Sequence, residues 1–150
     1  MNYINLIFSN KSILRILQIE EFEKEKLLGQ CIEFGANEEI EKNFLKINQT
    51  LYKPSFSNLN SKNKNIININ LEKKILNKKK YDNVVIFNVL EHLSDIKNAL
   101  KNINLLLKKN GKIFGSTPFL YRIHGAPKDY SRFTKDLIEI SLKDSKFKNI

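Results

Sequence analysis

The sequence predicts an α/β fold: a doubly wound, mostly parallel sheet with helices on both faces, in a three-layer αβα arrangement. Short apolar runs alternate along the chain with longer stretches whose apolar residues recur at helical spacing. Several runs, such as VVIF over 84–87, are apolar at every position, which is typical of parallel strands buried on both faces. The 150 residues fit one domain, with a helical extension over 1–29 and the α/β core over 31–150.

The clearest helix signal lies in the second half of the chain. Apolar residues recur every three or four positions from Ile96 to Leu107, with Ser94 before them as a capping residue and KNG after them. One face of this helix is therefore expected to be buried. A second predicted helix covers 13–28, between the N-cap Ser12 and Gly29. A third covers 37–47, with Ile40, Phe44 and Ile47 on one face. The last begins after the N-cap Thr134, with Phe133 and Ile138 as a hydrophobic staple.

Five strands are predicted, of which the fourth is the most distinct. Its segment, YDNVVIFNVLEHL over 81–93, has an apolar run between Asp82 and Asn88 and runs on into Glu91 and His92. The others cover 31–34 (CIEF); part of 51–58, where Pro54 restricts the strand to an edge or a broken strand; 66–70 (IININ); and a stretch from Gly111 (GKIFGSTP).

The chain has a net charge of +10 and a pI near 9.6, a balance that often indicates an anionic partner such as nucleic acid. Lysine, asparagine and isoleucine dominate together, as in AT-rich coding sequences, whereas arginine occurs only at Arg15, Arg122 and Arg132. Aromatic residues are not interleaved with the basic runs. We therefore interpret the lysine excess as solvated surface charge and do not expect nucleic-acid binding.

The single cysteine and the apolar start of the chain limit the cellular setting. Cys31 has no partner for a disulfide or for a cysteine-based zinc site, so a reducing cytoplasm is expected. The first residues are interrupted by Asn5, Asn10, Lys11 and Arg15, well short of the roughly 18 to 20 apolar residues of a spanning helix. No membrane span is predicted.

Polar residues follow each predicted strand. In an open parallel sheet, ligands bind outside the carboxyl ends of the strands, beside the point where the strand order reverses. The candidate positions are therefore 33–37, 57–60, 70, 88–92 and the segment from 117 onward. This topology explains why a buried strand ends in Glu91 and His92: that end faces a ligand.

These segments resemble class I S-adenosylmethionine-dependent methyltransferases, which have a Rossmann-like core. The residues 81–119 (YDNVVIFNVLEHLSDIKNALKNINLLLKKNGKIFGSTPF) are similar to the family's fourth strand, helix and fifth strand. CIEFGANEE resembles its first motif, and PFLYRIHGAPKDYSRFT is similar to the segment after strand five in members encoded near glycan-biosynthesis genes. The resemblance implies a methyltransferase that acts on a small-molecule or glycan-pathway acceptor.

The resemblance also implies how S-adenosylmethionine would be held. Glu33 would interact with its amino-acid end, and Gly35 would let the backbone approach it. Asn70 matches the position that contacts adenine, while Asn88 and Val89 would offer backbone contacts to the methionyl part. Asn37 stands where the family has a further glycine, and Asn58 lies near the position of the carboxylate that holds the ribose.

The polar and aromatic groups after strands four and five are candidates for acceptor binding. His92 and His124 are the candidate catalytic residues, with His124 a general base if the acceptor is a hydroxyl. The substrate-binding candidates are Tyr121, Arg122, Asp129, Tyr130 and Arg132. Each has a purely structural alternative: His92 as a hydrogen-bonding group, Arg132 as the ion-pair partner of Asp129, and Glu33 as a loop cap. Two histidines fall short of the usual ligand number, so no metal site is expected.

Three alternatives accompany this interpretation. A nicotinamide dinucleotide is disfavoured, because Glu38 and Glu39 at the start of the first core helix would repel its phosphates. A degenerate, non-catalytic scaffold would explain the missing glycines and the missing carboxylate after strand two. Finally, the resemblance implies two strands beyond the fifth, so the chain is expected to be a truncated product or to cover its strand-five edge with a partner, such as a second copy in a homodimer.

Overall fold

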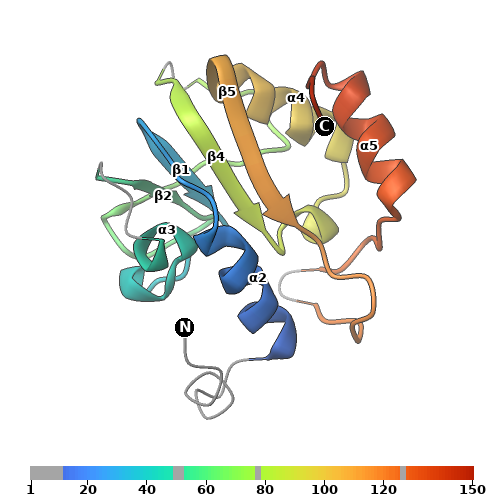
Figure 1. Ribbon diagram of the computed structural model, residues 1–150, viewed down its shortest axis with the longest axis horizontal. Coiled ribbons are helices and arrows are strands. Elements are labelled where there is room, and N and C mark those ends of the chain that lie inside the picture. Colours follow the sequence, from blue (N-terminus) through green and yellow to red (C-terminus); the bar gives the residue numbers. More distant parts are fainter. Residues whose placement is uncertain (1–11, 49–52, 77–78, 126–127) are drawn as a thin grey trace.

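The computed structural model describes residues 12–48, 53–76, 79–125 and 128–150. Its centre is a five-stranded, all-parallel sheet with the order β3-β2-β1-β4-β5. The strand order reverses between β1 and β4, as expected for a doubly wound sheet. The strands are β1 (Cys31–Phe34), β2 (Ser55–Ser57), β3 (Ile66–Ile67), β4 (Tyr81–Phe87) and β5 (Leu107–Ser116). Figure 1 shows β1, β4 and β5 side by side, with the arrowheads at their carboxyl ends pointing the same way.

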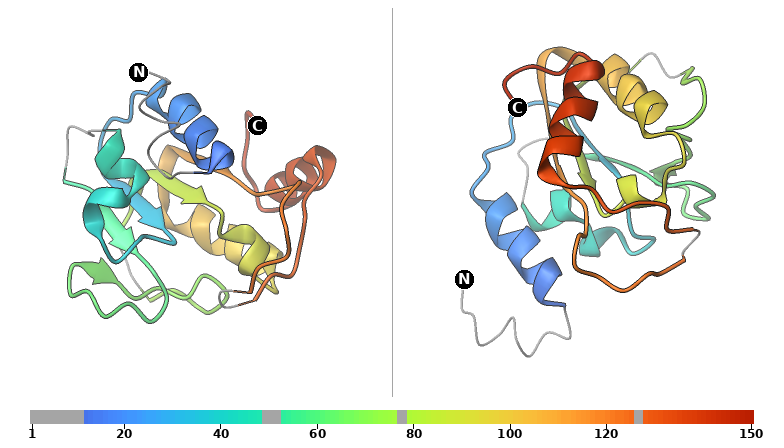
Figure 2. Two further views of the ribbon diagram at one scale, coloured as in Figure 1. Left: turned by 90° about the horizontal axis from the view of Figure 1, so that it is seen from below. Right: turned by 90° about the vertical axis from the view of Figure 1, so that its right-hand side faces the viewer.

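Helices cover both faces of this sheet, so the predicted α/β fold is confirmed. Alternate residues of β4 explain why: Val84 and Ile86 join one hydrophobic core, whereas Val85 joins the other. The first core packs against α4 (Ile96–Leu106) and α5 (Lys135–Asp144), and the second against α2 (Ile13–Glu23) and α3 (Phe44–Ile47). Figure 2 shows the sheet between α2 and α3 on one side and α4 on the other.

Helix α2 is shorter than the predicted 13–28. Ser12 caps its start as expected, accepting a hydrogen bond from the Arg15 backbone N–H, but the helix ends at Glu23. The side chain of Asn48, at the end of α3, donates to the carbonyls of Phe22 and Glu25. In a longer helix these carbonyls would instead accept backbone N–H groups of the following turn.

The predicted helix over 37–47 is broken in two. A 3₁₀ turn over Ile40–Lys42 (η1) precedes α3, and Asn43 separates them in an extended conformation. The buried side chain of Asn43 explains the break, because its amide donates to the carbonyls of Asn37 and Ile40 and accepts from the Asn37 N–H. Side-chain bonds of this kind compete with helical ones.

Four other elements differ from prediction. Strand β2 lies inside the sheet, not at an edge, because it begins after Pro54 and needs no N–H from it. Strand β3 has two residues rather than five, and Asn70 lies beyond it in a turn, where its side chain accepts from the Glu72 N–H. Helix α4 is capped by Asp95, while Ser94 binds the Glu72 carboxylate instead. Strand β5 begins at Leu107, directly after α4.

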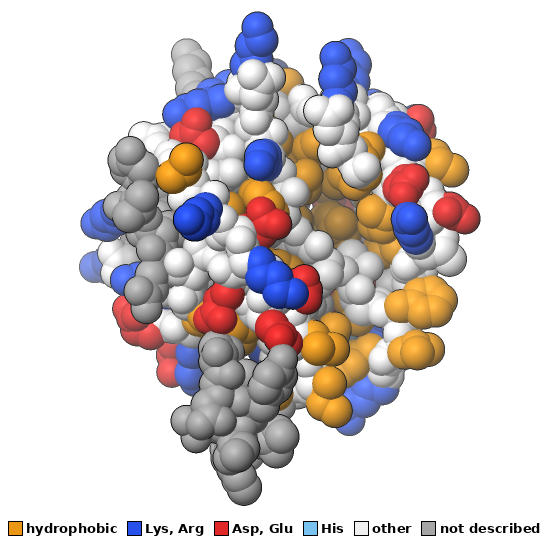
Figure 3. All heavy atoms as spheres, viewed as in Figure 1, with side chains coloured by type: hydrophobic (Ala, Val, Ile, Leu, Met, Phe, Trp, Pro, Cys, Tyr) orange, Lys and Arg blue, Asp and Glu red, His pale blue; other side chains and the backbone are white. Residues whose placement is uncertain are grey.

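The last helix, α5, starts as predicted after the N-cap Thr134. It leaves a narrow apolar cavity of about 150 Å³ between itself and β5, the edge strand of the described sheet. Figure 3 shows hydrophobic side chains gathered around this hollow. None of the described helices is long and apolar enough to cross a membrane.

Candidate functional site

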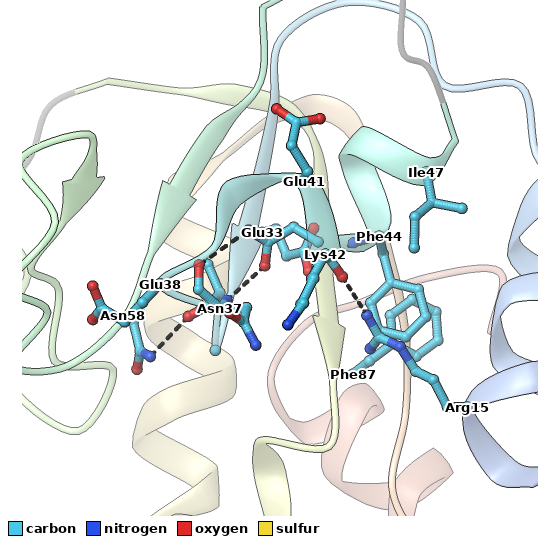
Figure 4. A pocket seen from close by; sticks show the side chains of 13 residues that line it. Arg15, Glu33, Asn37, Glu38, Glu41, Lys42, Phe44, Ile47, Asn58 and Phe87 are labelled. Atoms are coloured by element: carbon cyan, nitrogen blue, oxygen red, sulfur yellow. Dashed lines mark hydrogen bonds between the residues drawn. The ribbon is translucent and has the colours of Figure 1, made fainter. Parts of the chain in front are cut away.

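A cavity of about 830 Å³ opens at the carboxyl ends of β1, β2 and β4, where the strand order predicts a ligand site. Figure 4 shows its lining side chains, which come from α2, from the loop after β1 and from the strand ends. The lining residues are Arg15, Glu33, Gly35, Ala36, Asn37, Glu38, Glu41, Lys42, Asn43, Phe44, Ile47, Asn58 and Phe87. The cavity is thus within the range of roughly 300 to 1,000 Å³ that is typical of small-molecule sites.

Gly35 makes the sharp turn that leads from β1 into the cavity wall. Its φ of +71° lies in the left-handed region, which glycine adopts without steric cost. A Cβ at this position would lie 2.3 Å from a methyl group of Val89, so the two segments are in close contact. In the structure Val89 packs against Gly35, and the predicted approach of Gly35 to a cofactor stays a prediction.

Glu33 is a buried carboxylate at the floor of the cavity. It is 4% exposed, and its two oxygens accept hydrogen bonds from the backbone N–H groups of Phe44 (3.1 Å) and Leu45 (2.8 Å). Burial raises the pKa of Glu33 above its ordinary value, although these bonds and the charge of Arg15 act in the opposite direction. The capping role considered from the sequence is confirmed, and contact with a cofactor stays a prediction.

Arg15 is a cavity residue that the sequence interpretation did not identify. Its guanidinium lies 3.5 Å above the ring of Phe44 and donates to the Lys42 carbonyl at 2.7 Å, as Figure 4 shows. Burial lowers the pKa of Arg15, and the nearby Glu33 partly offsets this. No local signal in the sequence marks this residue, because α2 reaches the cavity only through tertiary packing.

The other predicted cofactor-binding residues divide into two groups. Asn37 and Asn58 line the cavity, and the Asn58 amide donates to the Ala36 carbonyl at 2.8 Å. Asn70 and Asn88 are not among the lining residues. Asn70 lies in a turn after β3, where its side chain accepts from the Glu72 N–H. Asn88, with a φ of +55°, exchanges two side-chain hydrogen bonds with Gln18 of α2, at 2.8 and 3.1 Å. Gln18 also donates to the Ser116 hydroxyl at 2.7 Å, which ties α2 to the ends of β4 and β5.

The predicted acceptor residues do lie together. The rings of His92 and His124 are 5.0 Å apart, and that of Tyr121 is 5.2 Å from His124. Arg132 donates to both carboxylate oxygens of Asp129, whose side chain is 2% exposed and also accepts from the His124 N–H at 3.0 Å.

This network has a defined electrostatic character. The Arg132 guanidinium, with help from the His124 N–H, holds the pKa of Asp129 far below its usual range, so the carboxylate is ionised at all ordinary pH values. Arg132 also donates to the backbone carbonyls of Tyr121 and Arg122. The side chains of Tyr121, Arg122 and Tyr130 are exposed and face solvent around the network. The expected pairing of Arg132 with Asp129 is confirmed.

Glu91 lies beneath the two histidines and was not identified as a site residue from the sequence. It belongs to a 3₁₀ turn over Leu90–His92 (η2) and is fully buried. Burial raises the pKa of its carboxyl, opposed in part by its own backbone N–H and by the positive charge that His92 and His124 carry when they are protonated. Its backbone carbonyl accepts the Tyr130 N–H at 2.7 Å, which joins η2 to the segment after β5.

A family model described as a methyltransferase domain matches residues 10–144, nearly the whole chain. The chain belongs to this methyltransferase domain family. The match includes α2, the cavity and the histidine network. A stretch of 66 residues, 41% of this chain, is also 36% identical to polyketide synthase ThaQ of Burkholderia thailandensis. That stretch represents 3% of the polyketide synthase.

Solved methyltransferase structures share the fold. One is a chain from the complex between the Haloferax volcanii Trm112 methyltransferase activator and a methyltransferase, with a TM-score of 0.66 and 10% identity, over 85% of this chain and 66% of that one. Another is the glycopeptide N-methyltransferase MtfA, with a TM-score of 0.54 and 12% identity, over 77% of this chain and 61% of that one. This chain therefore spans less than two thirds of the length of both, and at such identities the likeness shows the Rossmann-like fold alone.

Proposed function

We propose that this methyltransferase-family chain binds S-adenosylmethionine in the cavity at the ends of β1 and β2 and transfers its methyl group to an acceptor beside His92 and His124. The observation that best supports this is a cavity at the carboxyl ends of the strands that is lined by both signs of charge, with the histidine network at the carboxyl end of the neighbouring β4. Val89 joins the two, because it contacts Gly35 and is followed within three residues by His92.

The cavity residues fit the chemistry of this cofactor. Its amino-acid end carries one carboxylate and one ammonium, which would pair with Arg15 and Glu33 respectively. The amides of Asn37 and Asn58 would bind its hydroxyl and adenine groups. Phe87, which also lines the cavity, supplies an apolar wall. When bound, S-adenosylmethionine supplies an electrophilic methyl group.

The protein's part in the reaction is then mainly positioning. Holding donor and acceptor in line at near-attack distance can lower the barrier by roughly 7 to 11 kcal/mol at best. In this proposal the exposed Tyr121, Arg122 and Tyr130 would bind the acceptor, and His124 would accept the proton of an acceptor hydroxyl. Transfer of the methyl group would break its bond to sulfur, and the cofactor would leave as a neutral thioether. Asp129 and Arg132 hold His124 in place. We propose a small-molecule or glycan-pathway acceptor, on the resemblance of residues 118–134, and a cytoplasmic location, in keeping with the free, buried Cys31.

Isothermal titration with S-adenosylmethionine and S-adenosylhomocysteine tests the cofactor site. Arg15→Ala is expected to weaken the binding of both compounds about ten- to a hundredfold, because it removes one charge-assisted hydrogen bond to the carboxylate of the cofactor. Arg15→Lys retains the charge and should lose less. Lys108→Ala is a matched control, because Lys108 pairs with Asp82 near the start of β4, at the opposite end of the sheet. Equal affinity in the parent chain and Arg15→Ala would contradict the assignment of the cavity.

A second candidate function is a non-catalytic scaffold. Two observations favour it: Val89 fills the space next to Gly35, and backbone N–H groups already occupy both oxygens of Glu33. A folded chain that binds neither cofactor nor its demethylated product would support this alternative.

The predicted homodimer remains a separate proposal. Its support is that β5 is an edge strand of the described sheet and lies beside an apolar hollow. Light scattering at high concentration tests it, and a monomer would refute it.

A further inference from the structure

One carboxylate and two imidazoles meet at the carboxyl end of β4, and none of them lines the cavity described above. Glu91, His92 and His124 each offer one ligand atom, and these atoms all lie within 4.8 Å of one another. Glu91 and His92 come from η2, whereas His124 comes from the segment after β5, which runs beside η2 in Figure 1. The sequence places His124 more than thirty residues from the other two, so only the fold forms this group.

Glu91 has a carboxylate without a hydrogen-bond partner among the described residues, although His92 Nε2 lies within ion-pair distance of it. The residue is 0% exposed, and neither of its side-chain oxygens has a hydrogen-bond partner among the described residues. A buried carboxylate without partners is strongly unfavourable in its ionised form unless a cation compensates it. Tyr130 anchors the backbone of Glu91, so the side chain is fixed in this environment.

His92 has the arrangement of a metal ligand. Its Nδ1 lies against the backbone carbonyl of Lys128. A carbonyl can only accept, so Nδ1 carries a proton, and in the neutral imidazole the lone pair then lies on Nε2. The Nε2 atom is 3.8 Å from Glu91 Oε1. Histidines that bind metals commonly donate their other N–H to a backbone carbonyl or carboxylate in this way.

His124 is held from the opposite side. Its Nδ1 is 3.1 Å from Asp129 Oδ2, without the alignment of a hydrogen bond, and its backbone N–H donates to the same oxygen. Because Arg132 fixes Asp129 with two hydrogen bonds, the carboxylate is a rigid support for the imidazole. The side chains of His92 and His124 are 15% and 32% exposed, so solvent reaches the group from their side.

We propose that Glu91, His92 and His124 bind a divalent first-row transition-metal cation. Two imidazoles and a carboxylate, without thiolate, suit Zn²⁺, Co²⁺, Ni²⁺ or Mn²⁺. In a tetrahedral site with ligands at about 2.0 to 2.2 Å, the donor atoms are about 3.4 Å apart. The three side chains therefore close in by about an ångström on binding, a movement open to the two partly exposed imidazoles.

Three protein ligands leave at least one coordination position open, as in catalytic rather than structural metal sites. That position faces solvent between the imidazoles, beside Tyr121, where we place the acceptor. An oxygen or nitrogen donor of the acceptor is the ligand expected there. With the cation bound, both histidines are ligands, and His124 no longer serves as a base. Two histidines alone fall short of the usual ligand number, and buried Glu91 is the third ligand in this proposal.

A Zn²⁺ titration of the untagged chain, followed by ¹H–¹⁵N NMR of the imidazoles, tests this proposal. The chain contains two histidines, so every imidazole signal comes from His92 or His124. We expect both sets of signals to change together and to saturate at one equivalent of Zn²⁺. Visible absorption of bound Co²⁺ gives an independent measure of the same site. Neither experiment requires the cofactor, so failure of cofactor binding leaves the metal proposal standing, and the reverse also holds.

Variants then assign the ligands. His124→Ala and Glu91→Gln should each lower the Zn²⁺ affinity at least about tenfold. Loss of a residue that only hydrogen-bonds to a metal ligand already costs about ten- to a hundredfold, so loss of a ligand should cost no less. Glu33→Gln is the matched control, because it also removes a buried carboxylate, but one whose oxygens accept backbone N–H groups. His124→Ala, at a partly exposed side chain, provides the answer if Glu91→Gln does not fold. Absence of Zn²⁺ binding at millimolar concentration by the folded chain, or an affinity unchanged in His124→Ala, overturns the proposal.

Discussion

Replacing Gly35 with alanine probes the contact that joins the cavity to the segment after β4. An alanine at φ +71° costs about 1 to 2 kcal/mol in backbone strain. Its Cβ would also lie 2.3 Å from a methyl group of Val89, and a valine can move that methyl only by turning to a less favoured rotamer. Overpacking of this kind costs about 1 to 3 kcal/mol. We therefore expect Gly35→Ala to lower the free energy of unfolding by about 2 to 5 kcal/mol, adding the two costs.

A double-mutant cycle separates the two costs. Val89→Ala alone should lower the free energy of unfolding by about 1 kcal/mol, because the side chain is only partly buried. In the Val89→Ala background the steric cost is gone, and Gly35→Ala should cost only the backbone strain of about 1 to 2 kcal/mol. Urea unfolding followed by circular dichroism gives all four values, and the coupling should be about 1 to 3 kcal/mol. If Gly35→Ala costs the same in both backgrounds, Val89 does not limit this position and the described contact is wrong.

Three further predictions concern buried polar groups. Because burial raises the pKa of Glu33, the folded state binds the Glu33 proton more tightly than the unfolded state does. Protonated Glu33 therefore stabilises the fold below the ordinary pKa of 4.5, and this stabilisation is lost as the pH rises through the raised pKa. Urea unfolding from pH 4 to 7 should show the parent chain losing stability relative to Glu33→Gln, and a relative gain would contradict this sign. Asp129→Asn should increase the rate of limited proteolysis in the segment after β5, since Arg132 then loses its ionised partner; an unchanged rate would show that the ion pair does not order the segment. Gln18→Ala should lower the free energy of unfolding by about 1 to 3 kcal/mol by leaving Asn88 unpaired, and equal urea midpoints would show that this amide pair contributes nothing.

The sheet and the best-patterned helix follow from local sequence. Strands β1 and β4 are apolar runs, and α4 has a regular apolar face, so hydrophobic patterning alone locates them. The end of α2 and the break at Asn43 could not be predicted, because distant side-chain amides decide them. Asn48 satisfies carbonyls of α2 from more than twenty residues away, and short-range patterns contain no information about such a partner.

The sequence predicts those site residues whose position follows from the strand order. It does not predict those whose role depends on being buried in the folded chain. The rule that ligands bind at the carboxyl ends of parallel strands led to Glu33 and to the histidines. Arg15 was missed because its place in the cavity depends on how α2 packs. Glu91 was missed as a site residue because a glutamate next to a histidine at a strand end is usually solvated, and only the tertiary structure shows that this one is buried.

The link between α2 and the strand ends also constrains how the chain folds during synthesis. Gln18 leaves the ribosome early, but its partner Asn88 follows 70 residues later and Ser116 follows 98 residues later. Strand β1 likewise pairs with β4, its neighbour where the strand order reverses, only after β4 has been made. Contacts so distant in sequence form slowly, because a long loop must close before they stabilise the chain. During translation α2 can pack early against α3, but its contacts with β4 and β5 form only once these strands have been made, and until then part of its apolar side is exposed to aggregation.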